Sequence, residues 1–300
     1  MNKLYILLVI LNISTISVAQ TGADSLLNDL AATTTPKTDK VFNTFKSVRV
    51  INTQSVEMLA AGALDFRILH RMGMVKNGIK DLFGLDNASM RMSFDYGITK
   101  DLTVGVGRST YKKELDALLK YRIKQQATGL KSFPISIVAV GGIVCNTLPW
   151  TDPNRKNYFS SRLAYYGQLL LARKVSNNFS VQLTPSIVHR NLVELNTDEN
   201  DVVSIGFGSR VKVSKRVAIV VDASPVVFGN RKGYNTMPLA IGVDIETGGH
   251  VFQLHFTNSV GMNEKAVITE TTQRWDKSEF QFGFNLSRMF TVKKNKATNF

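Results

Sequence analysis

The sequence predicts an all-β protein, an antiparallel transmembrane β-barrel of about 12 strands, from three observations. Long stretches of the chain alternate apolar and polar residues with the two-residue period of a strand. After the N-terminal residues, no stretch approaches the roughly 20 consecutive apolar residues that a membrane helix requires. The links between the alternating stretches are short and long in turn. Because lipid cannot satisfy exposed backbone groups, strands that cross a membrane must close into a barrel.

The N-terminal residues have the features of an export signal. Lys3 precedes an apolar run over residues 4–18, and the small residues at 17–19 form a cleavage site before Gln20. We therefore expect residues 1–19 to be removed as a signal peptide. Residues 20–55 are expected to form a periplasmic N-terminal segment and linker, with a short amphipathic helix at 23–33. The expected barrel covers residues 56–292, and residues 293–300 form a basic C-terminal tail.

Alternation of apolar and polar side chains defines the strands. In residues 89–98, Met92, Phe94 and Tyr96 alternate with polar or small neighbours, so one side of the strand is wholly apolar. The apolar side is expected to face lipid and the polar side the lumen, and an even number of strands is typical of bacterial barrels. The predicted strands begin near Glu57, Ala88, Asp101, Glu114, Phe133, Phe159, Phe179, Val202, Arg216, Met237, His250 and Ser278.

The lengths of the links provide an independent indication of a barrel. Links after the even-numbered strands are mostly tight, as at residues 99–100, 176–178 and 214–215. Links after the odd-numbered strands are mostly long, as at 73–87 and 258–277. This alternation is typical of periplasmic turns and extracellular loops, and a soluble β-sandwich has no reason to keep it.

The polar side of the strands predicts the lining of the lumen. One interpretation is an electrostatic constriction that selects ions by charge, with Arg67 and Arg91 as its first candidates. The other is a salt-bridged filling that closes a narrow barrel, which the near balance of eight basic and six acidic residues favours. His70 is placed near the extracellular end of the first strand, where it can cap a loop. The lumen candidates are Asp65, Arg67, Arg71, Arg91, Asp95, Asp116, Lys120, Arg122, Arg162, Arg210, Lys212, Asp222, Asp244 and Glu246, together with His255.

Several function classes lack the residues that they need. Cys145 is the only cysteine, which excludes an internal disulfide framework and a zinc site built on several thiolates. The four histidines do not have zinc-binding spacing, so no metal or cofactor is expected. The sequence has no Gly-x-Ser-x-Gly motif, and we expect neither catalytic residues nor an enzyme. The net charge of +14 is spread along the chain, which argues against nucleic acid as a partner.

Several motifs resemble those of a known family. They are Asp65-Phe66-Arg67-Ile68-Leu69-His70-Arg71-Met72-Gly73, Leu82-Phe83-Gly84-Leu85-Asp86, Arg91, Lys120-Tyr121-Arg122 and Gln125. The chain is similar to an uncharacterised group of outer-membrane β-barrel proteins from Bacteroidota, a domain of unknown function. The resemblance spans about residues 47–290, although members usually show an aromatic residue where Met72 stands. It implies an outer-membrane location and a barrel, and it brings no substrate or catalytic residue.

The leading functional hypothesis is an outer-membrane channel or binding barrel for a small polar solute. The alternative is a structural or partner-docking barrel whose residues 21–54 engage another envelope protein. An outer-membrane enzyme that acts on lipid or glycan is less favoured, because the sequence has no cluster of acid, base and nucleophile. The expected partners are outer-membrane lipid and the outer-membrane assembly machinery, which would recognise the aromatic residues Phe280, Phe282, Phe284 and Phe290 of the last strand.

Overall fold

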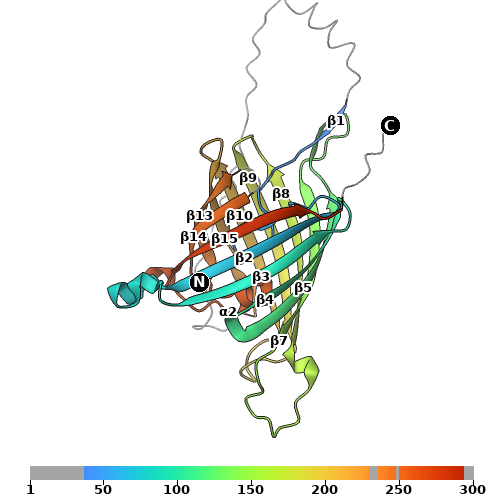
Figure 1. Ribbon diagram of the computed structural model, residues 1–300. Helices are drawn as coiled ribbons and strands as arrows, with labels where there is room; N and C mark the ends of the chain where they lie inside the picture. The colour runs from blue at the N-terminus through green and yellow to red at the C-terminus, as the bar shows by residue number, and fades with distance from the viewer. Residues whose placement is uncertain (1–36, 230–235, 248–249, 294–300) are drawn as a thin grey trace, which may run out of the picture.

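The computed structural model, which describes residues 37–229, 236–247 and 250–293, confirms the closed antiparallel barrel (Figure 1). Twelve strands form its wall, and the last of them pairs with the first. Among the described residues, no helix is long and apolar enough to span a membrane. The wall strands are β2 (Ala63–Met74), β3 (Ala88–Gly97), β4 (Leu102–Ser109), β5 (Glu114–Lys124), β7 (Ser136–Asn146), β8 (Leu163–Lys174), β9 (Phe179–Arg190), β10 (Asp201–Lys212), β11 (Val217–Ala223), β13 (Leu239–Thr247), β14 (His250–Thr257) and β15 (Gln281–Thr291).

Short elements complete the fold. Strand β12 (Val226–Phe228) continues β11 along β10 after an interruption at Pro225. Strands β1 (Thr38–Lys40) and β6 (Ala127–Gly129) pair in a separate sheet beyond the wall. The helices are η1 (Val75–Gly84), η2 (Tyr111–Lys113), η3 (Phe159–Arg162), α2 (Glu264–Glu270) and η4 (Trp275–Lys277).

The exposure of the side chains confirms which side of the wall faces outward. On β3, Phe94 is 49% exposed, whereas its neighbours Ser93 and Asp95 are 1% and 4% exposed. The same alternation places Val106 and Leu119 on the outside of the next two strands. The apolar side therefore covers the outer surface, and the ionic side chains lie in the lumen.

The two ends of the barrel differ in their connections. At one end, which we call the short-turn end, residues 98–101, 175–178 and 213–216 make tight turns. At the opposite, long-loop end, residues 75–87, 147–162, 191–200 and 258–280 connect the strands. The expected alternation of turns and loops is confirmed with two exceptions. The link at residues 110–113 is short at the long-loop end, and the link at residues 125–135 is longer at the short-turn end.

Strand β15 closes the barrel, because it pairs with β14 on one side and with β2 on the other. Phe284, for example, lies opposite Leu254 of β14 and His70 of β2. We predict that a chain truncated before Phe280 does not assemble in membranes, since both neighbouring strands lose their backbone partners. Heat-modifiable electrophoretic migration measures assembly, and a chain ending at Lys293 is the control. Normal migration of the shorter chain would contradict the prediction.

The largest departure from expectation concerns the residues before the first wall strand. Residues 44–59, which we call the plug segment, lie inside the lumen, where Phe45, Val50 and Ile51 are almost fully buried. The prediction assigned all of residues 20–55 to a periplasmic linker, whereas the structure places residues 44–55 in the barrel. The expected signal peptide and the helix at residues 23–33 lie outside the described residues.

The plug segment folds as a hairpin and brings apolar side chains into the lumen. The Val50 amide donates to the Thr53 carbonyl at 2.8 Å, and the Ser55 amide donates to the Val48 carbonyl at 2.9 Å. The lumen is therefore not polar throughout, because buried plug side chains form one cluster with apolar residues of the wall. Those wall residues are Leu118, Val138, Val140, Val144, Tyr166, Leu170, Ala172, Val188, Val202, Val220 and Ala240.

Candidate functional site

Most of the predicted lumen residues lie buried inside the barrel. Arg122 lies instead near the short-turn end beside Asp101, and Arg162 lies on η3 at the long-loop end, with its guanidinium 3.8 Å from the Trp150 ring centre. His70 was expected near a loop that it can cap. Its ring faces outward instead and stacks on Phe284, an outer-face side chain, at 4.9 Å. Lys212 is half-buried at the end of β10. The buried candidates are Asp65, Arg67, Arg71, Arg91, Asp95, Asp116, Lys120, Arg210, Asp222, Asp244 and His255.

Opposite charges pair within the lumen. The Arg91 Nε donates to Asp116 at 2.9 Å, and both side chains are almost fully buried. Arg67 pairs with Asp65 on its own strand. Arg210 lies 2.8 Å from Glu246, which also binds Lys46 of the plug segment at 3.0 Å. Of the two interpretations of the polar side, these contacts favour a salt-bridged filling over a ring of one charge.

Asp222 of β11 forms the centre of a cradle for the plug segment. Its Oδ2 accepts hydrogen bonds from the backbone amides of Asn52, Thr53 and Ile51 at 2.7, 2.9 and 3.1 Å. The Thr53 hydroxyl donates to the same carboxylate at 3.1 Å. These amides form the turn of the plug hairpin, and their N–H dipoles converge on one negative charge.

Other polar side chains of the wall satisfy the remaining plug backbone. The Lys120 ammonium donates to the Glu57 carbonyl at 2.7 Å, and the Gln253 amide donates to the Val50 carbonyl at 2.7 Å. Gln182 accepts from the Val56 amide at 3.0 Å and donates to the Gln54 carbonyl at 2.7 Å. Buried backbone groups need such partners, so the polar side of the wall serves to hold the plug segment.

An ion pair joins the plug segment to α2, the helix within the loop at residues 258–280. The Arg49 guanidinium lies 2.9 Å from the Glu264 carboxylate, and both side chains are almost fully buried. The Gln54 amide donates to the same carboxylate at 3.0 Å. Burial would raise the pKa of Glu264, but the guanidinium groups of Arg49 and Arg91 outweigh it and hold the pKa below its usual 4.5.

The ion pair between Arg49 and Glu264 predicts a pH dependence of plug retention. A carboxyl whose pKa is lowered by folding stabilises the folded state above its unfolded pKa, and this contribution is lost as the pH falls through the folded pKa. We expect Glu264→Gln to loosen the plug segment at neutral pH, with the difference from the unchanged protein vanishing well below pH 4.5. Protease sensitivity of the plug segment across pH measures this, and a difference that persists at low pH would contradict it.

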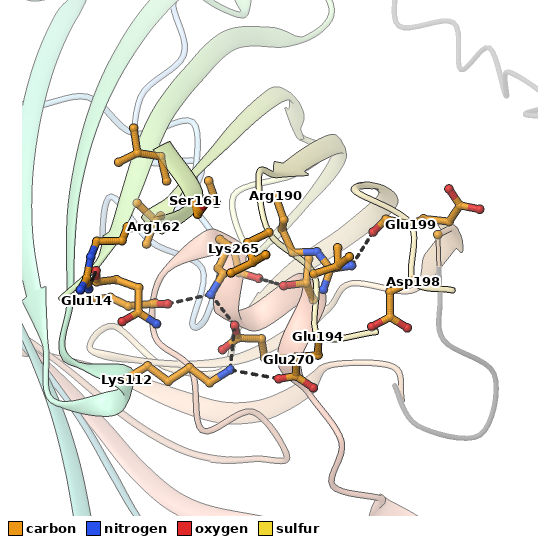
Figure 2. Close-up of a pocket in the computed structure, with 18 of the residues that line it drawn as sticks. Lys112, Glu114, Ser161, Arg162, Arg190, Glu194, Asp198, Glu199, Lys265 and Glu270 are labelled. Atoms are coloured by element: carbon orange, nitrogen blue, oxygen red, sulfur yellow. Dashed lines mark hydrogen bonds and ion pairs between the residues drawn. The ribbon is translucent and has the colours of Figure 1, made fainter. Parts of the chain in front are cut away.

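A vestibule opens at the long-loop end above α2 and has a volume of about 980 Å³ (Figure 2). Segments far apart in the sequence form its walls: η2, the ends of β7 and β9, the loop at residues 191–200 and α2. Its labelled lining carries both charges, namely Lys112, Glu114, Arg162, Arg190, Glu194, Asp198, Glu199, Lys265 and Glu270.

Alternating charges run across the floor of the vestibule. Lys265 of α2 donates to Glu114 of β5 at 2.7 Å and also binds Glu270 at the other end of α2. Lys112 of η2 lies 3.1 Å from Glu270. Burial raises the pKa of Glu270, but Lys265 and Lys112 outweigh it and lower the pKa below its usual value. These ion pairs hold the floor of the vestibule in place. Because Lys265 follows Glu264 in sequence, the floor is directly connected to the residue that binds the plug segment.

Sequence reasoning missed the plug contacts of Arg49 and the role of the loop at residues 258–280. One signal was available: Asn263 is a favourable N-cap residue, and its side chain accepts a hydrogen bond from the Ala266 amide at 2.9 Å. The apolar residues Phe45, Val48 and Val50 also interrupt the supposed linker. Among residues 37–229, 236–247 and 250–293, no three metal-ligating side chains cluster in a way that would hold an ion.

Comparison with solved structures finds matches to the fold, three of which follow. The COG4313 outer membrane channel from Pseudomonas putida F1 is 13% identical, with 78% of this chain and 98% of the channel covered and a TM-score of 0.47. CdiB from Acinetobacter baumannii is 9% identical over 78% and 61% of the two chains, with a TM-score of 0.34. LpxR from Salmonella typhimurium is 8% identical over 76% and 99%, with a TM-score of 0.31.

No curated protein matches the sequence significantly. A family model does match, over residues 45–290, and its description is a membrane bound beta barrel domain (DUF5777). The match begins within the plug segment and ends in β15, so it covers both the closed wall and the segment that fills it. The chain therefore belongs to the DUF5777 family of membrane-bound β-barrel domains.

Proposed function

We propose that the protein is an outer-membrane barrel that binds a small polar solute in its vestibule, above a lumen that the plug segment closes. The outer-membrane location is supported by the closed barrel with an apolar outer surface, the form in which strands cross a bilayer. The export signal expected at residues 1–19 is consistent with this location.

The observation that carries the proposal is the position of the vestibule over a filled lumen. A cavity of about 980 Å³ is large enough for a small solute, and its lining is rich in charged groups. Next in sequence to Lys265 of the vestibule lining, Glu264 forms a buried ion pair with Arg49 of the plug segment, which fills the lumen. Passage through the barrel then requires the plug segment to move, so the resting protein is a closed binding barrel.

Trp150 offers a direct test of solute binding, because its ring stacks on Arg162, which lines the vestibule. In a Trp275→Phe variant, Trp150 is the only tryptophan. We expect its fluorescence to change saturably with at least one of sucrose, glycine and inorganic phosphate. A Trp150→Phe variant is the control for signals unrelated to the vestibule. The absence of a saturable change with all three solutes would contradict solute binding.

The short-turn end favours a second candidate function, a barrel that docks a periplasmic partner. Strand β1 (Thr38–Lys40) pairs on one side with β6, as Thr38 with Gly129 and Lys40 with Ala127, and an edge strand can pair with another chain. Deleting residues 20–40 would then remove co-purifying envelope proteins, with the barrel itself still assembled. Unchanged partners after that deletion would argue against docking.

A further inference from the structure

The loop between β2 and β3 exposes apolar side chains on a segment that stands away from the barrel (Figure 1). In η1 and the residue after it, Ile79 is 83% exposed, and Leu82, Phe83 and Leu85 are each half exposed. The loop that contains α2 does the opposite, because residues 264–269 of that helix are buried. An apolar cluster of this size on a loop calls for a covering surface.

The conformation of η1 holds these side chains outward. Leu82 and Phe83 have φ angles of 44° and 55°, in the left-handed region that bulky residues rarely adopt. The base of the loop is closely packed, since a Cβ atom on Gly84 would lie 2.2 Å from the Gly73 carbonyl oxygen. The apolar residues are therefore exposed on a strained turn with a packed base, and such strain tends to mark functional segments.

The base of the loop lies beside an aromatic cluster of the outer surface. The Val75 amide donates to the Phe280 carbonyl at 2.9 Å, and Lys76 pairs with Glu279 at 2.7 Å. Phe280 stacks on Trp275 at 4.7 Å and meets the edge of Phe256 at 5.8 Å. Aromatic residues of this kind mark the boundary between bilayer and water on barrels. The loop therefore begins at that boundary, in continuity with the lipid-facing side of β2 and β3.

We propose that Ile79, Leu82, Phe83 and Leu85 insert into the outer leaflet beside the barrel, at the boundary between acyl chains and headgroups. Lys80, which is exposed on the same segment, extends to the headgroup phosphates, as long basic side chains do at membrane surfaces. The surface is covered by membrane lipid. The inserted loop then fixes the depth and tilt of the barrel in the leaflet. The inference is independent of solute binding in the vestibule.

An environment-sensitive label tests the insertion in the full chain. In a Cys145→Ser background, Ile79→Cys is labelled with a nitrobenzoxadiazole dye and reconstituted in phosphatidylcholine and phosphatidylglycerol vesicles. Asn154→Cys, on the exposed loop at residues 147–162, is the matched control. We expect blue-shifted emission at position 79 and several-fold stronger quenching by acyl-chain nitroxide lipids than at position 154.

Two results would overturn the inference. Water-like emission at position 79, equal to that at position 154, would show that lipid does not cover the loop. Blue-shifted emission without quenching by nitroxide lipids, together with disulfide-linked dimers of the unlabelled Ile79→Cys variant, would assign the surface to a second copy of the chain. Quenching without such dimers supports the lipid contact.

Discussion

Deleting residues 41–60, so that Lys40 is joined to Ala61, should convert a non-conducting barrel into one that conducts ions across planar bilayers. The deletion removes the plug segment, whose buried residues occupy the lumen between Asp222 of β11 and Lys120 of β5. Lys40 and Ala61 both lie near the short-turn end, the former in β1 and the latter just before β2, so the join does not need to cross the lumen. Discrete conductance steps in the variant, absent from the unchanged protein, are the expected result.

A lack of conductance in the deletion variant is informative only if the variant still forms the closed barrel. Heat-modifiable migration reports the closed barrel, and a deletion of residues 151–157 in a long loop leaves the plug contacts in place and serves as the control. A properly assembled deletion variant that remains silent would exclude transport through this lumen. The binding function of the vestibule would then stand alone, to be judged by the Trp150 titration.

The substitution Asp222→Asn should loosen the plug segment without removing it. A neutral amide accepts the three backbone N–H groups less strongly than the carboxylate does, because hydrogen bonds to charged groups contribute about 1.5–3 kcal/mol and neutral ones about 0.5–1.5 kcal/mol. A loss of about 1.4 kcal/mol or more corresponds to a rise of roughly tenfold in the population with the plug displaced. Open probability in planar bilayers and protease sensitivity of the plug segment measure that population.

Asp65→Asn is the matched control for the Asp222 substitution. Asp65 is also a buried carboxylate of the lumen, but its ion pair is with Arg67 of the same strand. We expect this control to leave the open probability much closer to that of the unchanged protein. Equal increases in open probability for the two variants would mean that the loss of any lumen carboxylate loosens the wall. The proposed role of Asp222 in holding the plug segment would then be wrong.

These expectations follow from one property of the lumen. Its polar side chains not only pair with each other but also provide the hydrogen-bond partners that a buried hairpin needs. Asn285, for example, donates to the Ile51 carbonyl at 3.0 Å, and Arg71 donates to the Asn52 side chain at 3.0 Å. The polar side chains that would line an open lumen therefore also bind the plug segment that closes it.

The outer surface and the floor of the vestibule show how far sequence reasoning reaches. The exposed position of Phe94 and the buried position of Arg91 followed from two-residue alternation, which each strand carries in its own residues. Lys265 and Glu114 are 151 positions apart in the sequence, and no local sequence pattern predicts their contact. To predict this contact, one would need to know that the loop at residues 258–280 folds into the barrel, whereas η1 folds away from it.

The sequence by itself determined the barrel, the side of each strand that meets lipid and the ends at which turns and loops lie, because strand periodicity and link length are local properties of the chain. Only the tertiary structure decided that the segment ahead of the first strand fills the lumen. That outcome rests on contacts such as those from Ile51 to Asp222, 171 positions away, and from Arg49 to Glu264. Which side chains meet across a lumen depends on the tilt and stagger of all the strands together, and those are fixed only when the barrel closes.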